Sequence, residues 1–329
     1  MKRMLLSLLL FLAFSAGLLH AQERTDSSSH TVQFVTVDKD VKLEVLDWGG
    51  TGRPMIFLAG LGNDAHVFDS FAPKFTPQFH VYGITRRGFG ASSKPAPEDD
   101  NYSADRLGDD VLAVMSALKL ERPILVGHSL AGEELSSIGS RFPVKVAALI
   151  YLDAGYGYAY YDKAHGDTIF DFFQLKKRLD EFTAGDMHDP QQSLKEMSAD
   201  VASFDHDLQE AVKRDPSVPG LHPPSRPIPP IVLAINLGGH KYETIPVPVL
   251  AIFACPHNFD FDRMLGNNPA LKAQVVAEDT FTTTRQADAF ASGVPSAHVI
   301  RIANADHYVF RSNEADVVKE MDAFLSTLH

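Results

Sequence analysis

The sequence predicts an α/β fold in which a mostly parallel β-sheet is covered by helices on both faces. Short apolar runs alternate along the chain with segments that repeat apolar residues at helical spacing. Two β-rich runs precede this alternation and read as a hairpin, as expected for an antiparallel start to an otherwise parallel sheet. The chain has 329 residues, of which 45% are hydrophobic and 22% charged, so it is long enough for a large core and is not a disordered, collagen-like or coiled-coil protein.

The strands can be assigned in order from their apolar runs. Residues 31–37 and 41–47 are expected to form the hairpin, with Asp38-Lys39-Asp40 as its turn. Continuous apolar runs typical of buried strands follow at residues 55–58, 80–84, 123–126, 147–152, 249–253 and 298–302.

Helices are expected between these strands. Leu107, Val111, Val114, Met115 and Leu118 share one helical face. Near the C-terminus a second face is formed by Val317, Val318, Met321, Leu325 and Leu328, with Asn313 as a candidate N-cap. Residues 155–242 interrupt the alternation, since they are rich in aromatic and charged side chains and contain a proline-rich stretch at 216–230. Helical segments at 170–182 and 194–212 would suit a lid inserted between two strands.

The N-terminus has the pattern of a secretory signal. Lys2 and Arg3 precede an apolar run at residues 4–19, and residues 19–21 offer a cleavage site, so residues 1–21 are expected to be removed. The run is short for a bilayer span, although an uncleaved N-terminal anchor is the alternative. We therefore expect a secreted or periplasmic protein with no membrane span after cleavage.

Charge and cysteine content narrow the function further. Lys and Arg total 30 against 42 Asp and Glu, which gives a formal charge of −12. An acidic chain without a basic cluster lacks the electrostatic footprint of a nucleic-acid binder. The single cysteine, Cys255, cannot form an internal disulfide, and no Cys/His spacing resembles a structural zinc site.

The strongest catalytic signal is Gly127-His128-Ser129-Leu130-Ala131, directly between an apolar strand and a predicted helix. It matches the nucleophile elbow G-x-S-x-G, with Ala131 in place of the final glycine. Small residues around Ser129 allow the sharp turn that would expose its hydroxyl at the end of the strand. Ser129 is therefore the candidate nucleophile, and a helix-capping serine is the structural alternative.

On these residues the chain resembles the α/β-hydrolase superfamily, from about residue 30 to the C-terminus. Residues 85–92 also resemble the family's D-x-R-G-x-G-x-S turn, with Thr85 in place of the aspartate. The resemblance implies an eight-stranded sheet, a helical lid after strand six and the chain order nucleophile, acid, histidine. It divides the chain into a signal (1–21), a first core part (22–154), a lid (155–242) and a second core part (243–329).

The resemblance also suggests the remaining catalytic groups. His307 lies in the loop after the last predicted strand, where the family carries its histidine. In most relatives the acid follows strand seven, roughly nine residues beyond a proline like Pro248, and His257 occupies that position here. Asp260 would serve if the loop is longer than usual, and Asp153 at the end of strand six would serve as it does in some relatives. We favour Asp260 over Asp153, with Asp262 third.

The oxyanion hole is expected to combine the backbone N–H of Leu130 with that of Leu61 in the glycine-rich loop after strand three. The aromatic side chains early in the predicted lid could line an apolar pocket or pack the lid against the core. They are Tyr156, Tyr158, Tyr160, Tyr161, Phe170, Phe172 and Phe173. Glu133 and Glu134, in the first turn after the elbow, are expected to complement the helix dipole rather than to act in catalysis.

We therefore expect a serine hydrolase that cleaves carboxylic esters of a small to medium apolar substrate without a metal or organic cofactor. A serine at the elbow argues against epoxide hydrolase and haloalkane dehalogenase chemistry, since those relatives use aspartate there. Amidase, lactonase, carbon–carbon hydrolase and cofactor-free haloperoxidase-like activities stay open. So does a non-catalytic ligand-binding or envelope interaction protein that keeps the fold. Substrate identity and oligomeric state cannot be read from the sequence.

Overall fold

The computed structural model describes residues 29–98, 100–185, 189–214, 227–258 and 269–328. The predicted signal at residues 1–21 and the candidate acids Asp260 and Asp262 lie outside these ranges. Within the described chain, no helix is both long enough and apolar enough to pass through a bilayer.

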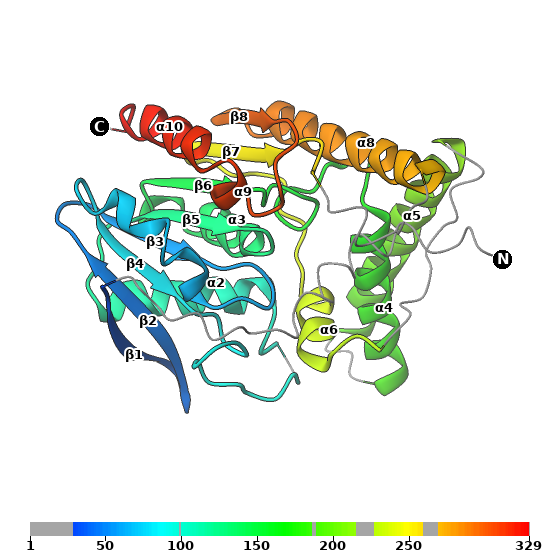
Figure 1. Ribbon diagram of the computed structural model, residues 1–329. Coiled ribbons are helices and arrows are strands. Elements are labelled where there is room, and N and C mark those ends of the chain that lie inside the picture. Colours follow the sequence, from blue (N-terminus) through cyan, green and yellow to red (C-terminus); the bar gives the residue numbers. More distant parts are fainter. Residues whose placement is uncertain (1–28, 99, 186–188, 215–226, 259–268, 329) are drawn as a thin grey trace.

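An eight-stranded sheet forms the centre of the molecule (Figure 1). Its strands are β1 (Thr31–Asp38), β2 (Val41–Gly49), β3 (Pro54–Leu58), β4 (His80–Ile84), β5 (Ile124–His128), β6 (Ala148–Leu152), β7 (Val249–Ala254) and β8 (Ala297–Ile302). Their spatial order is β1-β2-β4-β3-β5-β6-β7-β8. β2 is antiparallel to both of its neighbours and the other pairs are parallel. The predicted α/β fold with an opening hairpin is therefore confirmed.

Helices pack on both faces of the sheet. The helices of the described residues are α2 (Ala104–Ala117), α3 (Ala131–Arg141), α4 (Thr168–Ala184), α5 (Pro190–Arg214), α6 (Pro230–Leu237), α8 (Pro269–Gly293), α9 (Val309–Ser312) and α10 (Glu314–Leu325). The same residues also form the short 3-10 helices η2 (Ala65–Phe68), η3 (Ala72–Phe75) and η4 (Pro143–Lys145). α10 begins after Asn313 as predicted, but the Asn313 side chain makes no cap hydrogen bond.

The strand pleat sorts the core into two clusters, one on each face. Along β3, Ile56 and Leu58 belong to one cluster, whereas Met55 and Phe57 belong to the other. The first cluster includes apolar side chains of α2, α3 and α8, and the second includes those of η2, η3, α9 and α10. Because both faces are covered, the central parallel strands β3, β5, β6 and β7 are almost wholly apolar and buried, as their sequences predicted, whereas the edge strand β8 carries His298 and Arg301.

The turn after β4 is held by buried polar contacts. Arg87 forms a two-pronged ion pair with Asp110 of α2, with N···O distances of 2.6 and 2.5 Å. Thr85, which replaces the family's aspartate, donates from Oγ1 to Glu44 Oε2 at 2.7 Å and accepts from Ala65 N at 3.0 Å. The turn therefore stays anchored despite the substitution.

Helices α4, α5 and α6 occur between β6 and β7 in the chain, and Figure 1 shows them to one side of the sheet. α4 begins at Asp167, whose side chain accepts from the N–H groups of Ile169 (3.1 Å) and Phe170 (3.0 Å). It ends at Gly185, whose φ of 72° suits a left-handed helix terminus. The segments predicted as helical at 170–182 and 194–212 lie within α4 and α5.

Candidate functional site

Ser129 lies at a sharp turn between β5 and α3. Its φ is +53°, a left-handed conformation that is uncommon for a residue other than glycine. The turn is closely packed: a Cβ at Gly132 would lie 2.0 Å from the carbonyl oxygen of Ala154. The Ser129 N–H donates to Leu152 O at 3.2 Å, which ties the turn to the end of β6. The strained, partly exposed serine is therefore held in place by its neighbours.

His307, in the loop between β8 and α9, contacts a buried carboxylate. Its Nδ1 donates to Oδ2 of Asp153 at 2.6 Å. The loop is held beside the serine turn, since Nε2 of His128 donates to the carbonyl oxygen of His307 at 3.1 Å. Burial, the largest influence on His128, and the neighbouring His307 lower the pKa of His128 well below its usual value, so His128 is a neutral donor.

Asp153 directly follows β6 and is fully buried, with a φ of +47°. Its Oδ1 accepts from Tyr156 Oη at 2.8 Å and from the Ala254 N–H at 3.0 Å. Burial is the largest influence and would raise the pKa of Asp153. His257 and His307 together outweigh it and bring that pKa well below the usual range. Asp153 is therefore an anion at neutral pH.

His257 stands behind this pair. Its Nε2 donates to the same Oδ2 of Asp153 at 2.7 Å, and its Nδ1 donates to Oδ1 of Asp279 on α8 at 2.8 Å. Burial alone would lower the pKa of His257, but the two carboxylates raise it to about 10. His257 is thus a buried imidazolium.

Among the described residues, two groups of side chains offer metal-ligand atoms within 4.8 Å of one another. In the group of Asp153, His257 and His307, N···O distances of 2.6 and 2.7 Å are hydrogen-bond distances. Two ligands of one tetrahedral zinc ion would be roughly 3.3 Å apart at usual bond lengths. The second group is His30, His66 and Asp69, where His66 Nδ1 lies 3.0 Å and His30 Nδ1 lies 3.8 Å from Asp69. That group could hold a divalent cation.

The loop after β3 packs directly against Ser129. A Cβ on Gly60 would lie 3.0 Å from the Cβ of Ser129, so only glycine allows this approach. Within the described chain, the backbone N–H groups of Leu61 and Leu130 have no hydrogen-bond acceptor. Leu130 is only 6% exposed, and a buried N–H without an acceptor is rare in folded proteins. The two predicted oxyanion donors are therefore available to a ligand oxygen.

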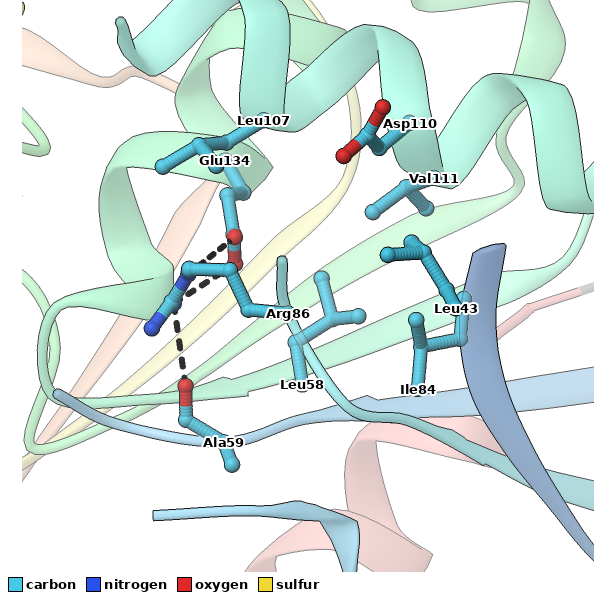
Figure 2. A pocket seen from close by; sticks show the side chains of 9 residues that line it. All are labelled: Leu43, Leu58, Ala59, Ile84, Arg86, Leu107, Asp110, Val111 and Glu134. Carbon is cyan, nitrogen blue, oxygen red and sulfur yellow. Dashed lines mark hydrogen bonds and ion pairs between the residues drawn. The ribbon is translucent and has the colours of Figure 1, made fainter. Parts of the chain in front are cut away.

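Arg86 anchors this loop to α3, because its guanidinium lies between Ala59 and Glu134 (Figure 2). Its guanidinium donates to both carboxylate oxygens of Glu134, at 2.5 and 2.9 Å, and to the carbonyl oxygen of Ala59 at 3.0 Å. Arg86 and Glu134 line a cavity of about 10 Å³, room for about one water molecule. Glu134 thus has a buried ionic partner in addition to its place in the first turn of α3.

The aromatic side chains after β6 have different environments. Tyr158 packs against the small apolar cluster that contains Leu130, and burial followed by the charge of Asp153 raises the pKa of Tyr158 well above its usual value. Phe170 is buried and packs near Tyr161, whereas Phe172 is 39% exposed. Two of the aromatics, Tyr156 and Tyr158, therefore contact the candidate site.

The structure joins the predicted residues His307 and Asp153 by a hydrogen bond, ties the His307 loop to His128 beside Ser129, and packs the loop of Leu61 against Ser129. His257 and Asp279 were not predicted as site residues. The count from Pro248 reached His257 but was made in search of an acid. Asp279 had no signal, since it lies on a helix that the apolar pattern did not indicate.

Comparisons with known proteins agree with this architecture. A fluoroacetate dehalogenase from Burkholderia sp is 34% identical over 107 residues, covering 32% of this chain and 35% of that protein. A 2-(acetamidomethylene)succinate hydrolase from Mesorhizobium japonicum is 28% identical over 104 residues, covering 32% and 36% respectively. The chain thus spans about a third of the length of these curated relatives.

Solved structures match over more of the chain. An epoxide hydrolase from Bacillus megaterium covers 90% of this chain and is itself covered in full, with a TM-score of 0.56 and 20% identity. A bromoperoxidase from Bacillus anthracis gives the same TM-score, identity and coverage. At such identities these matches show the fold alone. The model of the alpha/beta hydrolase fold family matches residues 53–313, which include most of the sheet and every candidate site residue. The chain therefore belongs to the alpha/beta hydrolase fold family.

Proposed function

We propose that the protein is a serine hydrolase that cleaves carboxylic esters of small to medium apolar substrates. The observation that carries this proposal is the 2.6 Å hydrogen bond between His307 and Asp153, beside a serine in a strained turn. Such a turn, histidine and carboxylate form the arrangement that activates a hydroxyl nucleophile. Curated relatives act as hydrolase and dehalogenase, and a serine at the turn supports the former.

In the proposed reaction, Ser129 Oγ attacks the ester carbonyl and passes its proton to Nε2 of His307. His307 then protonates the leaving alcohol. Asp153 holds the Nδ1–H tautomer and stabilises the imidazolium that forms. The N–H groups of Leu130 and Leu61 stabilise the oxyanion, and water attacks the acyl-enzyme with His307 again as base.

The acid is the point at which the structure alters our expectation. From the sequence we favoured Asp260, which lies outside the described residues. We now propose Asp153, because it is hydrogen-bonded to His307 and its other oxygen is fully engaged. Asp153→Asn should lower kcat by about 10⁴, as expected when the wrong histidine tautomer is favoured. Wild-type kcat for Asp153→Asn, together with a comparable loss in Asp260→Asn, would restore the first assignment.

Two assays test the activity itself. A fluorophosphonate probe should label the folded protein at Ser129 and fail to label Ser129→Ala. A series of p-nitrophenyl esters of increasing acyl length should be hydrolysed by the wild type and not by Ser129→Ala, and the best chain length reports the acyl preference. Folded protein that neither reacts with the probe nor hydrolyses any ester would instead support a ligand-binding protein. Amide, lactone and haloperoxidase substrates assayed beside the esters separate the other reaction classes.

We also propose that residues 1–21 are an export signal, on the basis of their charge and apolar pattern. N-terminal sequencing of protein recovered outside the cytoplasm should begin near residue 22. A product that retains Met1 in the membrane fraction would indicate an uncleaved anchor.

A further inference from the structure

His307 is the first of four buried side chains that are joined by successive hydrogen bonds. From His307 the hydrogen bonds run to Asp153 (2.6 Å), from Asp153 to His257 (2.7 Å) and from His257 to Asp279 (2.8 Å). All four residues are less than 9% exposed. They come from four different places in the fold: the loop after β8, the end of β6, the loop after β7 and α8.

Asp153 has no spare acceptor position in this arrangement. An ionised carboxylate offers about four lone-pair sites, two on each oxygen. Oδ1 accepts from Tyr156 and Ala254, while Oδ2 accepts from both His307 and His257. The two imidazoles thus share one oxygen, so the bond from His257 helps to determine where Oδ2 lies relative to His307.

His257 is itself held on two sides. Its backbone N–H donates to Oδ2 of Asp279 at 2.8 Å, so Asp279 binds both the ring and the main chain of this residue. The next N–H, of Asn258, donates to the carbonyl oxygen of Ala305 at 2.7 Å. Ala305 lies two residues before His307, so the loop that carries His257 is joined to the loop that carries the base.

The charges of these hydrogen-bonded groups partly offset one another. Among the described residues, the titratable groups that face His257 include Asp153, Asp279, the Tyr156 hydroxyl at 3.4 Å and the His307 ring at 6.0 Å. With His257 protonated, Asp153, His257 and Asp279 together carry one negative charge, as a lone carboxylate would. Asp279 therefore offsets the positive charge that His257 brings close to the base.

We propose that His257, held by Asp279, is a positioning residue that fixes the orientation of Asp153 toward His307. This inference rests on the proposed function, because its effect is exerted through the catalytic acid and base. In the position where most relatives carry the acid, this chain would have a histidine that supports an acid supplied by β6.

A matched pair of substitutions separates the two hydrogen bonds of His257. A glutamine amide extends about as far as the imidazole Nε2, so His257→Gln keeps a donor to Asp153 and loses the one to Asp279. An asparagine amide reaches about as far as Nδ1, so His257→Asn keeps the donor to Asp279 and loses the one to Asp153. Both replacements are uncharged, so the two variants differ only in whether the hydrogen bond to Asp153 or the one to Asp279 remains.

We expect His257→Asn to lower kcat on the best p-nitrophenyl ester by about 100-fold with KM nearly unchanged, and His257→Gln by about 10-fold or less. These values take as their guide the 10- to 100-fold losses that follow removal of an outer hydrogen-bond partner of a metal-ligating residue. The rate of fluorophosphonate labelling should fall in the same order. If the bond to Asp279 only supports the local fold, the order is reversed, and that order overturns the proposal, as do equal losses or wild-type kcat in both variants.

Asp279→Asn covers the case in which the His257 variants do not fold. It keeps one of the two acceptors for His257 and removes the other together with the balancing charge, and kcat should fall about 10-fold with KM unchanged; wild-type kcat would refute the proposal. Glu278→Gln, on the neighbouring position of α8, is the control and should behave as wild type. If the wild type is labelled at Ser129 and hydrolyses esters but the variants do not follow the expected order, this inference is refuted and the proposed function is not. Absence of labelling in the wild type refutes the proposed function and this inference with it.

Discussion

Replacement of Arg86 tests whether the buried Arg86–Glu134 ion pair beside the loop after β3 is required for the stability of the fold. The side chains of Arg86 and Glu134 are 4% and 3% exposed, and Arg86 makes three hydrogen bonds in this environment. Arg86→Met removes the cation and leaves Glu134 buried and unpaired, which should lower the free energy of unfolding by about 3–5 kcal/mol. Ala59 O also loses its donor, which adds roughly 1 kcal/mol.

The double variant Arg86→Met/Glu134→Leu separates the two contributions. Because it leaves no unpaired charge at this position, its unfolding free energy should return to within about 2 kcal/mol of the wild type. Its kcat should stay reduced, since Ala59, two residues before the proposed oxyanion donor Leu61, has lost its anchor. Arg106→Met is the control: Arg106 pairs with Asp38 at the surface, and its loss should change the unfolding free energy by at most about 1 kcal/mol.

Urea unfolding followed by circular dichroism, at pH 5 and pH 8, measures these differences. Burial, the largest influence, raises the pKa of Glu134 even with Arg86 present. Without Arg86 the folded protein binds a proton at Glu134 more tightly than the unfolded chain does. The decrease in the free energy of unfolding caused by Arg86→Met should therefore be smaller at pH 5 than at pH 8. The reasoning is refuted if the single variant is as stable as the wild type, or if the double variant is no more stable than the single.

Two further predictions concern the serine turn and the α4–α5 contact. Ser129→Gly should raise the unfolding free energy by about 1 kcal/mol while abolishing turnover, because glycine relieves the positive φ; Ser129→Ala loses the same hydroxyl but keeps the strain, so equal stability of the two variants would contradict this. Burial together with Asp171 raises the pKa of Asp207 to about 8, so the folded state holds a proton there that the unfolded chain releases near pH 4. The stability from this proton is complete below about pH 4 and is lost as the pH rises to about 8. Asp207→Asn should therefore gain stability relative to the wild type between pH 5 and pH 9 in urea unfolding, and a stability difference that stays constant with pH would show that Asp207 does not hold this proton in the folded state.

The central strands β3, β5, β6 and β7 were predictable because each is almost wholly apolar, a pattern that follows from burial on both faces. α8 was not predicted, although it is a long helix that covers one face of the sheet. Its buried positions include the polar residues Asp279, Thr283 and Gln286 between Val275 and Phe290. These residues have helical spacing, but their polar side chains interrupt the apolar pattern by which helices are recognised.

The candidate site likewise contains residues that the sequence indicates and a residue whose assignment it leaves open. Ser129 carries its own signal, since a nucleophile turn needs small residues at fixed offsets and a strand before it, and His307 follows from its place after the last strand. The choice of acid does not follow from spacing, because Asp153 and Asp260 both come after strands whose carboxyl ends lie at the same edge of the sheet. The described structure favours Asp153 through a contact between residues 154 positions apart.

The sequence alone determined the strands, several of the helices between them, the parallel sheet and the identity of the serine turn, because these depend on local conformation and on which residues must be buried. Only the tertiary structure brought His257 to Asp153, brought Asp279 to His257, and placed Arg86 beside the loop after β3. Hydrogen bonds and ion pairs of this kind join residues from separate elements, and their partners are chosen by the packing of the whole sheet and its helices. The local sequence around each residue therefore does not indicate which distant residue will be its partner.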